Sequence, residues 1–173
     1  MRVGIATDHG GFELKEDLKS YLNGLGHVVI DIGARELTPG DDYPDFVIPL
    51  AKSVAAGMVD RGVAVCGSGV GASVCANKIP GVRAGLVQDH YSAHQGVEHD
   101  DMNILCMGGR VVGPLVARDL VDAFLAASFT GEERHVRRLR KVAALEAAQR
   151  AAEEIPLRTG PCVEVATELP GRR

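Results

Sequence analysis

The chain has 173 residues, of which 46% are hydrophobic, and a formal net charge of -4 at pH 7. This length fits one ordinary domain with a buried core and is too short for two. The acidic balance excludes a general nucleic-acid-binding protein, which needs a basic surface. No apolar run approaches the roughly 20 residues that cross a bilayer, so we expect no membrane partner and a cytoplasmic location.

Short apolar segments alternate with helical segments along the chain. The expected strands cover residues 3–7, 28–32, 63–66, 83–87 and 103–107. Between them apolar residues recur at helical spacing, as at Leu14, Leu18 and Leu22. Parallel strands need crossover connections, so this alternation favours a parallel sheet. We predict an α/β fold, a Rossmann-like doubly wound sheet of five parallel strands in the order 2-1-3-4-5, with helices on both faces.

The C-terminal part is predicted to be a long helix followed by a tail. Thr130-Gly131-Glu132-Glu133 has the spacing of a capping box. Arg134 and Arg138 are four residues apart in the helix that follows and share a face, for which an ordinary solvated basic face is the alternative interpretation. The alanine-rich second half favours packing against a flat surface such as a second subunit. The expected division is one domain over residues 1–154 and a tail over residues 155–173.

Three alternate glycines follow the third expected strand, in Cys66-Gly67-Ser68-Gly69-Val70-Gly71. Glycine lets the backbone turn tightly with its N–H groups pointing outward. The chain looks helical from Ala72 onward, so this loop is expected to bind an anion at a helix N-terminus. Cys66 lies at the edge of the loop, where the same field favours a thiolate that removes a proton from carbon or attacks a carbonyl carbon. The alternative is a small buried structural cysteine.

The predicted topology brings two polar loops together. Ligands on doubly wound sheets bind beyond the carboxyl ends of the strands, where the winding direction reverses. In the predicted order this reversal lies between the first and third strands. Those strands end in Asp8-His9 and in Cys66-Gly67-Ser68, which favours the catalytic interpretation of Cys66.

Other motif interpretations fit less well. The segment from Gly67 to Ala72 satisfies a loose G-x-G-x-x-A dinucleotide pattern with Asp89 as the ribose-binding acid, but that pattern normally follows the first strand. No Gly-Lys-Ser/Thr follows the glycines, which excludes a Walker loop. His90 and His94 are one helical turn apart, as metal ligands would be, but no Glu lies between them in H-E-x-x-H order.

Several motifs at consistent spacing resemble the type B ribose-5-phosphate isomerases, a family that also includes galactose-6-phosphate, allose-6-phosphate and erythrulose-phosphate isomerases. The motifs are Asp8-His9-Gly10-Gly11-Phe12, Asp42-Tyr43-Pro44, Cys66 to Gly71, Ala76-Asn77-Lys78, Arg83-Ala84, His99-Asp100-Asp101-Met102-Asn103 and Gly109 to Gly113. The resemblance implies an enzyme that interconverts an aldose and a ketose phosphate by proton transfer through an enediolate. It implies no cofactor and no metal, with ribose 5-phosphate and ribulose 5-phosphate as the first expectation.

The resemblance also implies roles for individual residues. It makes Cys66 the base and Ser68 a group that moves protons between the sugar oxygens, and it assigns ring opening to Asp8 and His99. The backbone of the loop would hold the enediolate oxygen, at Gly67, Gly69, Val70 and Gly71. Phosphate-binding positions would be His9, Arg110, Arg134 and Arg138, and positions that contact or support the sugar would be Tyr43 and Asn103. The implied assembly is a homodimer with the site between subunits and the His99 loop from the partner; a tetramer is the alternative.

Two positions bear on the choice of base and substrate. Some relatives carry a glutamate base at the position of Cys75, but this chain has cysteine at both positions, which favours Cys66. Asp100 stands where pentose-specific relatives commonly carry asparagine, and an ionised carboxylate can only accept hydrogen bonds. The alternatives are therefore an isomerase of erythrulose 4-phosphate, allose 6-phosphate or galactose 6-phosphate, a non-catalytic sugar-phosphate-binding module, and an interaction protein built on the C-terminal helix.

Overall fold

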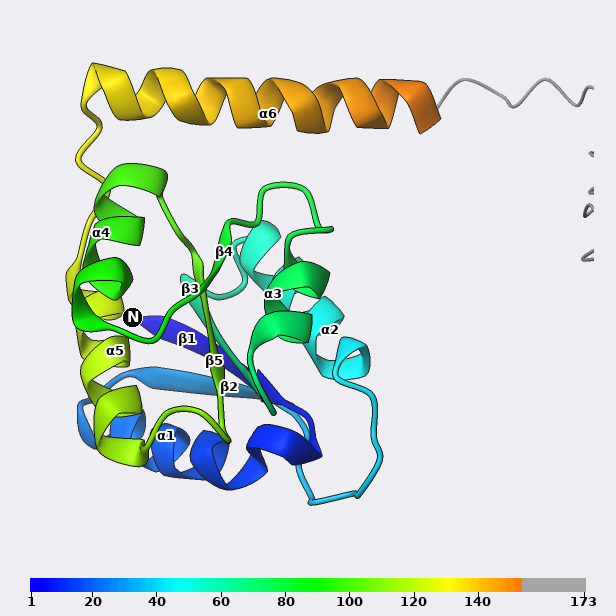
Figure 1. Ribbon diagram of the computed structural model, residues 1–173, viewed down its shortest axis with the longest axis vertical. Helices are drawn as coiled ribbons and strands as arrows, with labels where there is room; N and C mark the ends of the chain where they lie inside the picture. Colours follow the sequence, from blue (N-terminus) through cyan, green and yellow to red (C-terminus); the bar gives the residue numbers. More distant parts are fainter. Residues whose placement is uncertain (154–173) are drawn as a thin grey trace, which may run out of the picture.

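The computed structural model describes residues 1–153, in which five strands form one parallel sheet (Figure 1). The strands are β1 (Arg2–Thr7), β2 (Val28–Gly33), β3 (Arg61–Cys66), β4 (Ala84–Leu86) and β5 (Ile104–Gly108). Every neighbouring pair in the sheet runs parallel. The predicted α/β fold with five parallel strands is confirmed.

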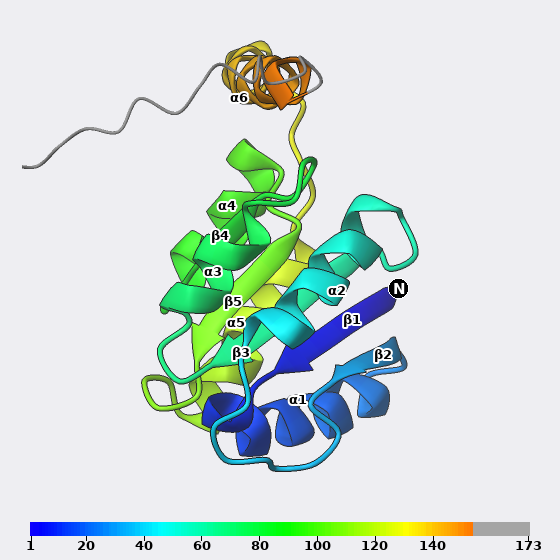
Figure 2. The ribbon, with the colours of Figure 1, turned by 90° about the vertical axis from the view of Figure 1, so that its right-hand side faces the viewer.

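Helices cover both faces of the sheet, as expected (Figures 1 and 2). One face packs against α1 (Phe12–Gly24), α4 (His90–Asp100) and α5 (Pro114–Ala126), and the other against α2 (Pro44–Ala55) and α3 (Val70–Ala76). A short 3-10 turn, η1 (His9–Gly11), joins β1 to α1. Side chains alternate across each strand. Val63 and Val65 therefore enter the core beneath α1, α4 and α5, and Cys66 enters the core beneath α2 and α3.

The order of the last two strands differs from the prediction. The observed order is β2-β1-β3-β5-β4, so β5 lies inside the sheet and β4 forms its edge. All five residues of β5 are buried, whereas β4 has three residues and none of them is fully buried. The strand with the longer apolar run therefore takes the interior position, next to β3. The reversal between β1 and β3 is present as predicted.

The last helix, α6 (Glu133–Glu153), lies across the amino-terminal end of the sheet near α4 (Figure 2). The predicted capping box is wrong, because Thr130 donates both its N–H and its hydroxyl to the carbonyl of Glu98 and the helix begins only at Glu133. Val142 and Leu145 on α6 are 50% and 62% exposed. The predicted tail, with Cys162, lies outside the described residues, and the division into domain and tail stays a prediction. Among residues 1–153 no helix has the length and apolar character needed to cross a membrane.

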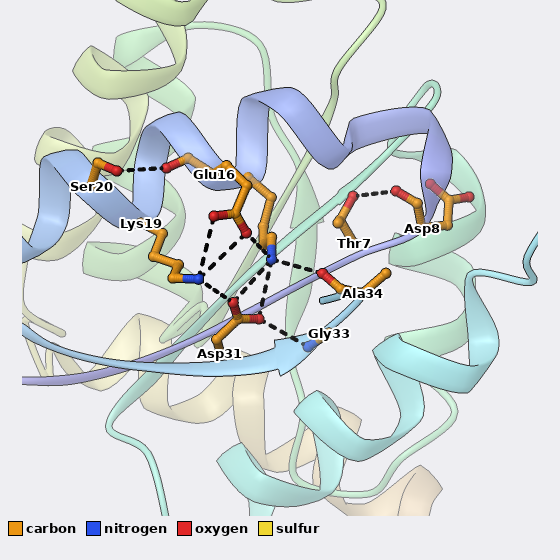
Figure 3. Close-up of polar contacts among 9 residues, drawn as sticks. Thr7, Asp8, Glu16, Lys19, Ser20, Asp31, Gly33 and Ala34 are labelled. Carbon is orange, nitrogen blue, oxygen red and sulfur yellow. Dashed lines mark hydrogen bonds and ion pairs between the residues drawn. The ribbon is translucent and has the colours of Figure 1, made fainter. Parts of the chain in front are cut away.

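A buried ion-pair network ties α1 to the sheet. Lys15 is fully buried, and its Nζ donates to both carboxylate oxygens of Asp31 at 3.0 and 3.2 Å and to the carbonyl of Ala34 at 2.8 Å. Lys19 reaches the same carboxylate at 2.7 Å, and Glu16 pairs with both lysines (Figure 3). Burial alone would raise the pKa of Asp31, but the hydrogen bonds from Lys19 and Lys15 outweigh it and lower the pKa. The network fixes the start of the loop that runs from Ala34 to α2.

Candidate active site

Cys66 is the last residue of β3 and is buried beneath α2 and α3. Its Sγ accepts a hydrogen bond of 3.0 Å from the N–H of Gly69. This bond requires the chain to reverse direction directly after β3. The reversal occurs at Gly69, which has φ +83°, a conformation that glycine adopts without strain. The N–H that was expected to face open space is therefore directed at the sulfur. The sulfur therefore has a fixed backbone donor at the carboxyl end of β3.

The other two cysteines within residues 1–153 are less suited to act as a base. Burial raises the pKa of the Cys75 thiol, and it raises the pKa of Cys106 much further at the centre of the sheet. A raised pKa keeps a thiol protonated at neutral pH. This comparison supports the choice of Cys66 over Cys75 that the sequence suggested.

Three glycine-containing loops meet at the carboxyl ends of β1, β3 and β5. A Cβ added to Gly10 would lie 2.7 Å from the backbone nitrogen of Gly67, and one added to Gly109 would lie 2.8 Å from the Cα of Gly11. A Cβ on Gly108 would lie 2.7 Å from the carbonyl carbon of Ser68. Since these loops touch backbone to backbone, no side chain fits between them. The loop after β5 is also bonded to the Cys66 loop, through Gly109 N–H to the Cys66 carbonyl at 2.8 Å.

Three further predicted site residues border this junction. Asp8 is buried and accepts a hydrogen bond of 2.9 Å from Gly10 N–H. The ring of Tyr43 lies against Gly71, where an added Cβ would be 2.8 Å from its Cζ. Arg110 follows β5, and its N–H donates to the Gly67 carbonyl at 3.1 Å. We call the set the Cys66 cluster; it consists of Asp8, His9, Tyr43, Cys66, Gly67, Ser68, Gly69, Val70, Gly71 and Arg110.

The remaining predicted site residues lie near the amino-terminal ends of the strands, opposite the Cys66 cluster. His99 and Asp100 end α4, and Asn103 directly precedes β5 and accepts a hydrogen bond of 2.9 Å from Gly62 N–H at its carbonyl. In the sheet register Gly62 pairs with Ile104, whereas Cys66 pairs with Gly108. Four residues of strand, about 13 Å, therefore separate the two ends. We call this set the His99 cluster; it consists of His99, Asp100, Asn103, Arg134, His135 and Arg138.

The contacts within the His99 cluster include one residue that the sequence did not indicate. His135 is buried, its ring centroid lies 4.1 Å from that of His99, and its Nδ1 is 3.0 Å from the His99 carbonyl. Arg134 Nε donates to His135 Nε2 at 2.9 Å. Arginine can only donate, so Nε2 accepts and Nδ1 carries the proton. His135 thus joins α6 to α4. In the sequence it lies within a run of basic residues, and nothing in that run distinguishes it from its neighbours.

The other members of this cluster differ in their freedom to bind a ligand. The side chain of Asn103 is occupied by the backbone, since it accepts from Arg83 N–H at 2.8 Å and donates to the Gly81 carbonyl at 2.9 Å. It is a supporting residue. Asp100 is exposed and lines a groove between α4 and α6, and Arg138 is exposed one turn beyond Arg134.

The structure gives the competing motif residues other partners. Asp89 accepts a hydrogen bond of 2.8 Å from Ser92 N–H and caps α4. His90 faces Asp119 and His94 faces Glu98, at 3.1 and 3.4 Å. Within residues 1–153 no group of three or more His, Cys, Asp or Glu side chains is placed to hold a metal ion.

Replacing Gly69 by alanine is expected to lower kcat by about tenfold or more, because the substitution moves the N–H donor away from Sγ. An added Cβ would lie 2.8 Å from the carbonyl carbon of Met107, and φ +83° strains any other residue. Gly26→Ala is the matched control, since Gly26 has φ +82° with open space around it. Steady-state kinetics and thermal melts of both variants test this. Equal loss of kcat in the two variants would show that backbone strain alone is responsible.

The fold and the site together define a parallel α/β protein. It presents a cysteine, an aspartate and an arginine at the carboxyl ends of its strands. A family profile described as Ribose/Galactose Isomerase matches residues 3–142. Ribose-5-phosphate isomerase B of Escherichia coli is 40% identical over 145 residues, which cover 84% of this chain and 96% of that protein. The chain belongs to the ribose/galactose isomerase family and is an aldose–ketose isomerase.

Solved structures agree with this membership. A ribose-5-phosphate isomerase B from Clostridium thermocellum superposes with a TM-score of 0.83 at 43% identity, covering 86% of this chain and 99% of that one. One from Mycoplasma genitalium, crystallised with bound ribulose 5-phosphate, gives a TM-score of 0.81 at 37% identity, covering 84% and 96%.

Proposed function

We propose that this chain interconverts ribose 5-phosphate and ribulose 5-phosphate, with Cys66 as the base. The observation that carries the proposal is the Cys66 sulfur, which accepts the Gly69 N–H at the meeting point of three backbone loops. The names of the Escherichia coli and Clostridium thermocellum relatives, and the ribulose 5-phosphate bound in the Mycoplasma genitalium protein, support the choice of substrate.

The proposed reaction moves one proton between two carbons. The Cys66 thiolate removes the proton from C2 of the open-chain aldose, and the electron pair forms the C1–C2 double bond of an enediolate. Backbone N–H groups of the loop from Gly67 to Gly71, apart from that of Gly69, which donates to Sγ, stabilise the charge on oxygen, which develops only during the reaction. Ser68 transfers a proton between the two oxygens, and the Cys66 thiol returns the proton to C1. Asp8 and His99 open the furanose ring beforehand.

We propose that each complete site combines the Cys66 cluster of one subunit with the His99 cluster of a second. The two clusters lie at opposite ends of the same strands within one chain, so one small substrate cannot touch both. A second copy in reversed orientation would bring the two together, with His9 and Arg110 on one side of the phosphate and Arg134 and Arg138 on the other. The exposed apolar residues Val142 and Leu145 of α6 support packing on a second copy.

Mixing two inactive variants tests this arrangement. Cys66→Ala lacks the base, and the double variant His99→Ala, Arg138→Ala lacks the opposite half of the site. In a dimer formed from both, one of the two sites is intact. Random assembly of an equal mixture is therefore expected to restore about a quarter of the wild-type activity.

Co-refolding of purified variants followed by an isomerisation assay measures the recovery. Each variant refolded with itself is the control and should stay inactive. A mixture with no more activity than its components would contradict the two-subunit site. A panel of four-, five- and six-carbon sugar phosphates tests the substrate, and a higher kcat/KM for a six-carbon sugar would assign Asp100 to a different pattern of hydroxyl groups.

A further inference from the structure

We propose that Asp41 is the positioning residue of the phosphate-binding part of this site: it orients His9 and holds its ring as a cation. The inference rests on the proposed function, in which His9 contacts the substrate phosphate. Asp41 belongs to no motif that marked the site in the sequence. It lies in the loop between β2 and α2, two residues before Tyr43.

The geometry at His9 fixes both its backbone and its ring. Oδ1 of Asp41 lies 2.8 Å from His9 N, from which it accepts a hydrogen bond, and 2.7 Å from His9 Nδ1. A carboxylate can only accept, so Nδ1 carries a proton. Nε2 is thereby left as the ring nitrogen that can face a ligand, and the His9 side chain remains 32% exposed. When the ring is protonated, Nε2 therefore presents one defined N–H to an anion.

The charges around His9 favour its protonated form. Asp41 faces it from the loop before α2, and Asp8 directly precedes it in the turn after β1. The hydrogen bond to Asp41 raises the pKa of His9 above its ordinary value; burial lowers it by less, and the charges of Asp8 and Asp41 raise it further. An imidazolium binds a phosphate dianion more strongly than a neutral ring does.

Asp41 itself is held in place and incompletely paired. The loop that carries it starts at Ala34, whose N–H donates to the Thr7 carbonyl at 2.8 Å and whose carbonyl accepts from the buried Lys15. The Asp41 side chain is 12% exposed, and its Oδ2 is buried without a hydrogen-bond partner among residues 1–153. A single buried carboxylate whose partner is His9 gains most of its stabilisation when that ring is charged.

Asp41→Asn tests the proposal, because asparagine keeps an oxygen acceptor and removes the charge. Below the ordinary pKa of His9 the ring is protonated in both proteins, and the two KM values for ribose 5-phosphate should agree. Between the ordinary and the raised pKa only the wild type keeps the imidazolium, so KM of the variant is expected to rise roughly five- to tenfold with kcat nearly unchanged. Glu36→Gln is the matched control, with the same change of charge on an exposed side chain of the same loop.

Titration of the His9 ring by NMR provides a readout that needs no turnover. The pKa of His9 should fall in Asp41→Asn and stay unchanged in Glu36→Gln, and inorganic phosphate should shift the His9 signal less in Asp41→Asn above neutral pH. An unchanged His9 titration, or a KM ratio that is equal at every pH, would overturn the role of Asp41. Absence of isomerisation by the wild type would instead refute the proposed function.

Discussion

Replacing Cys66 by alanine is expected to lower kcat for ribose 5-phosphate by about 10²–10⁴-fold, the usual contribution of a general base. In the proposed mechanism the sulfur removes the C2 proton, and the variant leaves the backbone donors and the proposed phosphate-binding side chains in place. Binding of ribose 5-phosphate, measured by calorimetry, should therefore change little. Exchange of the C2 proton with solvent deuterium, followed by NMR, should be lost together with turnover.

Cys75→Ala is the matched control for this experiment. Cys75 is a partly buried thiol on α3, the helix that directly follows the Cys66 loop. Its removal should leave kcat within about twofold of the wild type, because it makes no contact in the proposed reaction. Full activity of Cys66→Ala, or a greater loss in Cys75→Ala, would transfer the role of base away from Cys66.

Replacing Lys15 by methionine is expected to reduce the free energy of unfolding by about 3 kcal/mol, because it leaves the carboxylate of Asp31 without its buried partner. Urea denaturation should show a lower midpoint with an unchanged slope. Because the pKa of Asp31 is lowered in the folded protein, its contribution is present above the ordinary pKa of an aspartate and is lost as the pH falls through the lowered value. The difference between variant and wild type should therefore shrink in acid.

Lys19→Met controls for the location of the charge. Lys19 pairs with the same carboxylate but is 35% exposed, whereas Lys15 is fully buried. Water replaces an exposed partner, so Lys19→Met should cost less than about 1 kcal/mol. The double variant Lys15→Met, Asp31→Asn should recover part of the loss. Equal effects of the two lysine variants would contradict the importance of burial.

The local sequence pattern predicted the strands and helices well. It predicted less well which strands lie side by side in the sheet. Alternation of apolar segments gave five strands and their helices, since the 2-residue and 3.6-residue periods are properties of local sequence. The positions of β4 and β5 were exchanged because strand order depends on which segment packs on both faces. Ile104 to Gly108 are all buried there, while Ala84 to Leu86 lie at an edge. The prediction used the common strand order 2-1-3-4-5, but only tertiary packing decides which of the last two strands lies at the edge.

The same limit applies to the site. Cys66 and its glycines are adjacent in sequence, so their closeness followed from the chain itself, although the bond from Gly69 N–H to the sulfur did not. Asp41 reaches His9 across 32 residues, and Lys15 reaches Asp31 across 16. Lys15 looks like an ordinary polar residue between Leu14 and Leu18, and nothing local indicates that a strand brings a carboxylate to it. Such long-range polar contacts become visible only once β2 and the loop that follows it are placed.

The contacts among Gly10, Gly67 and Gly109 also restrict how this enzyme can change. The loops meet here through main-chain atoms, and a larger residue at Gly10, Gly108 or Gly109 would force them apart. Adaptation to a longer or differently configured sugar is therefore expected to proceed through the surrounding side chains, such as Tyr43 and, in the proposed two-subunit site, Asp100 of the second copy. The proton-transfer machinery and the selection of substrate are thus divided between parts of the molecule that can evolve separately.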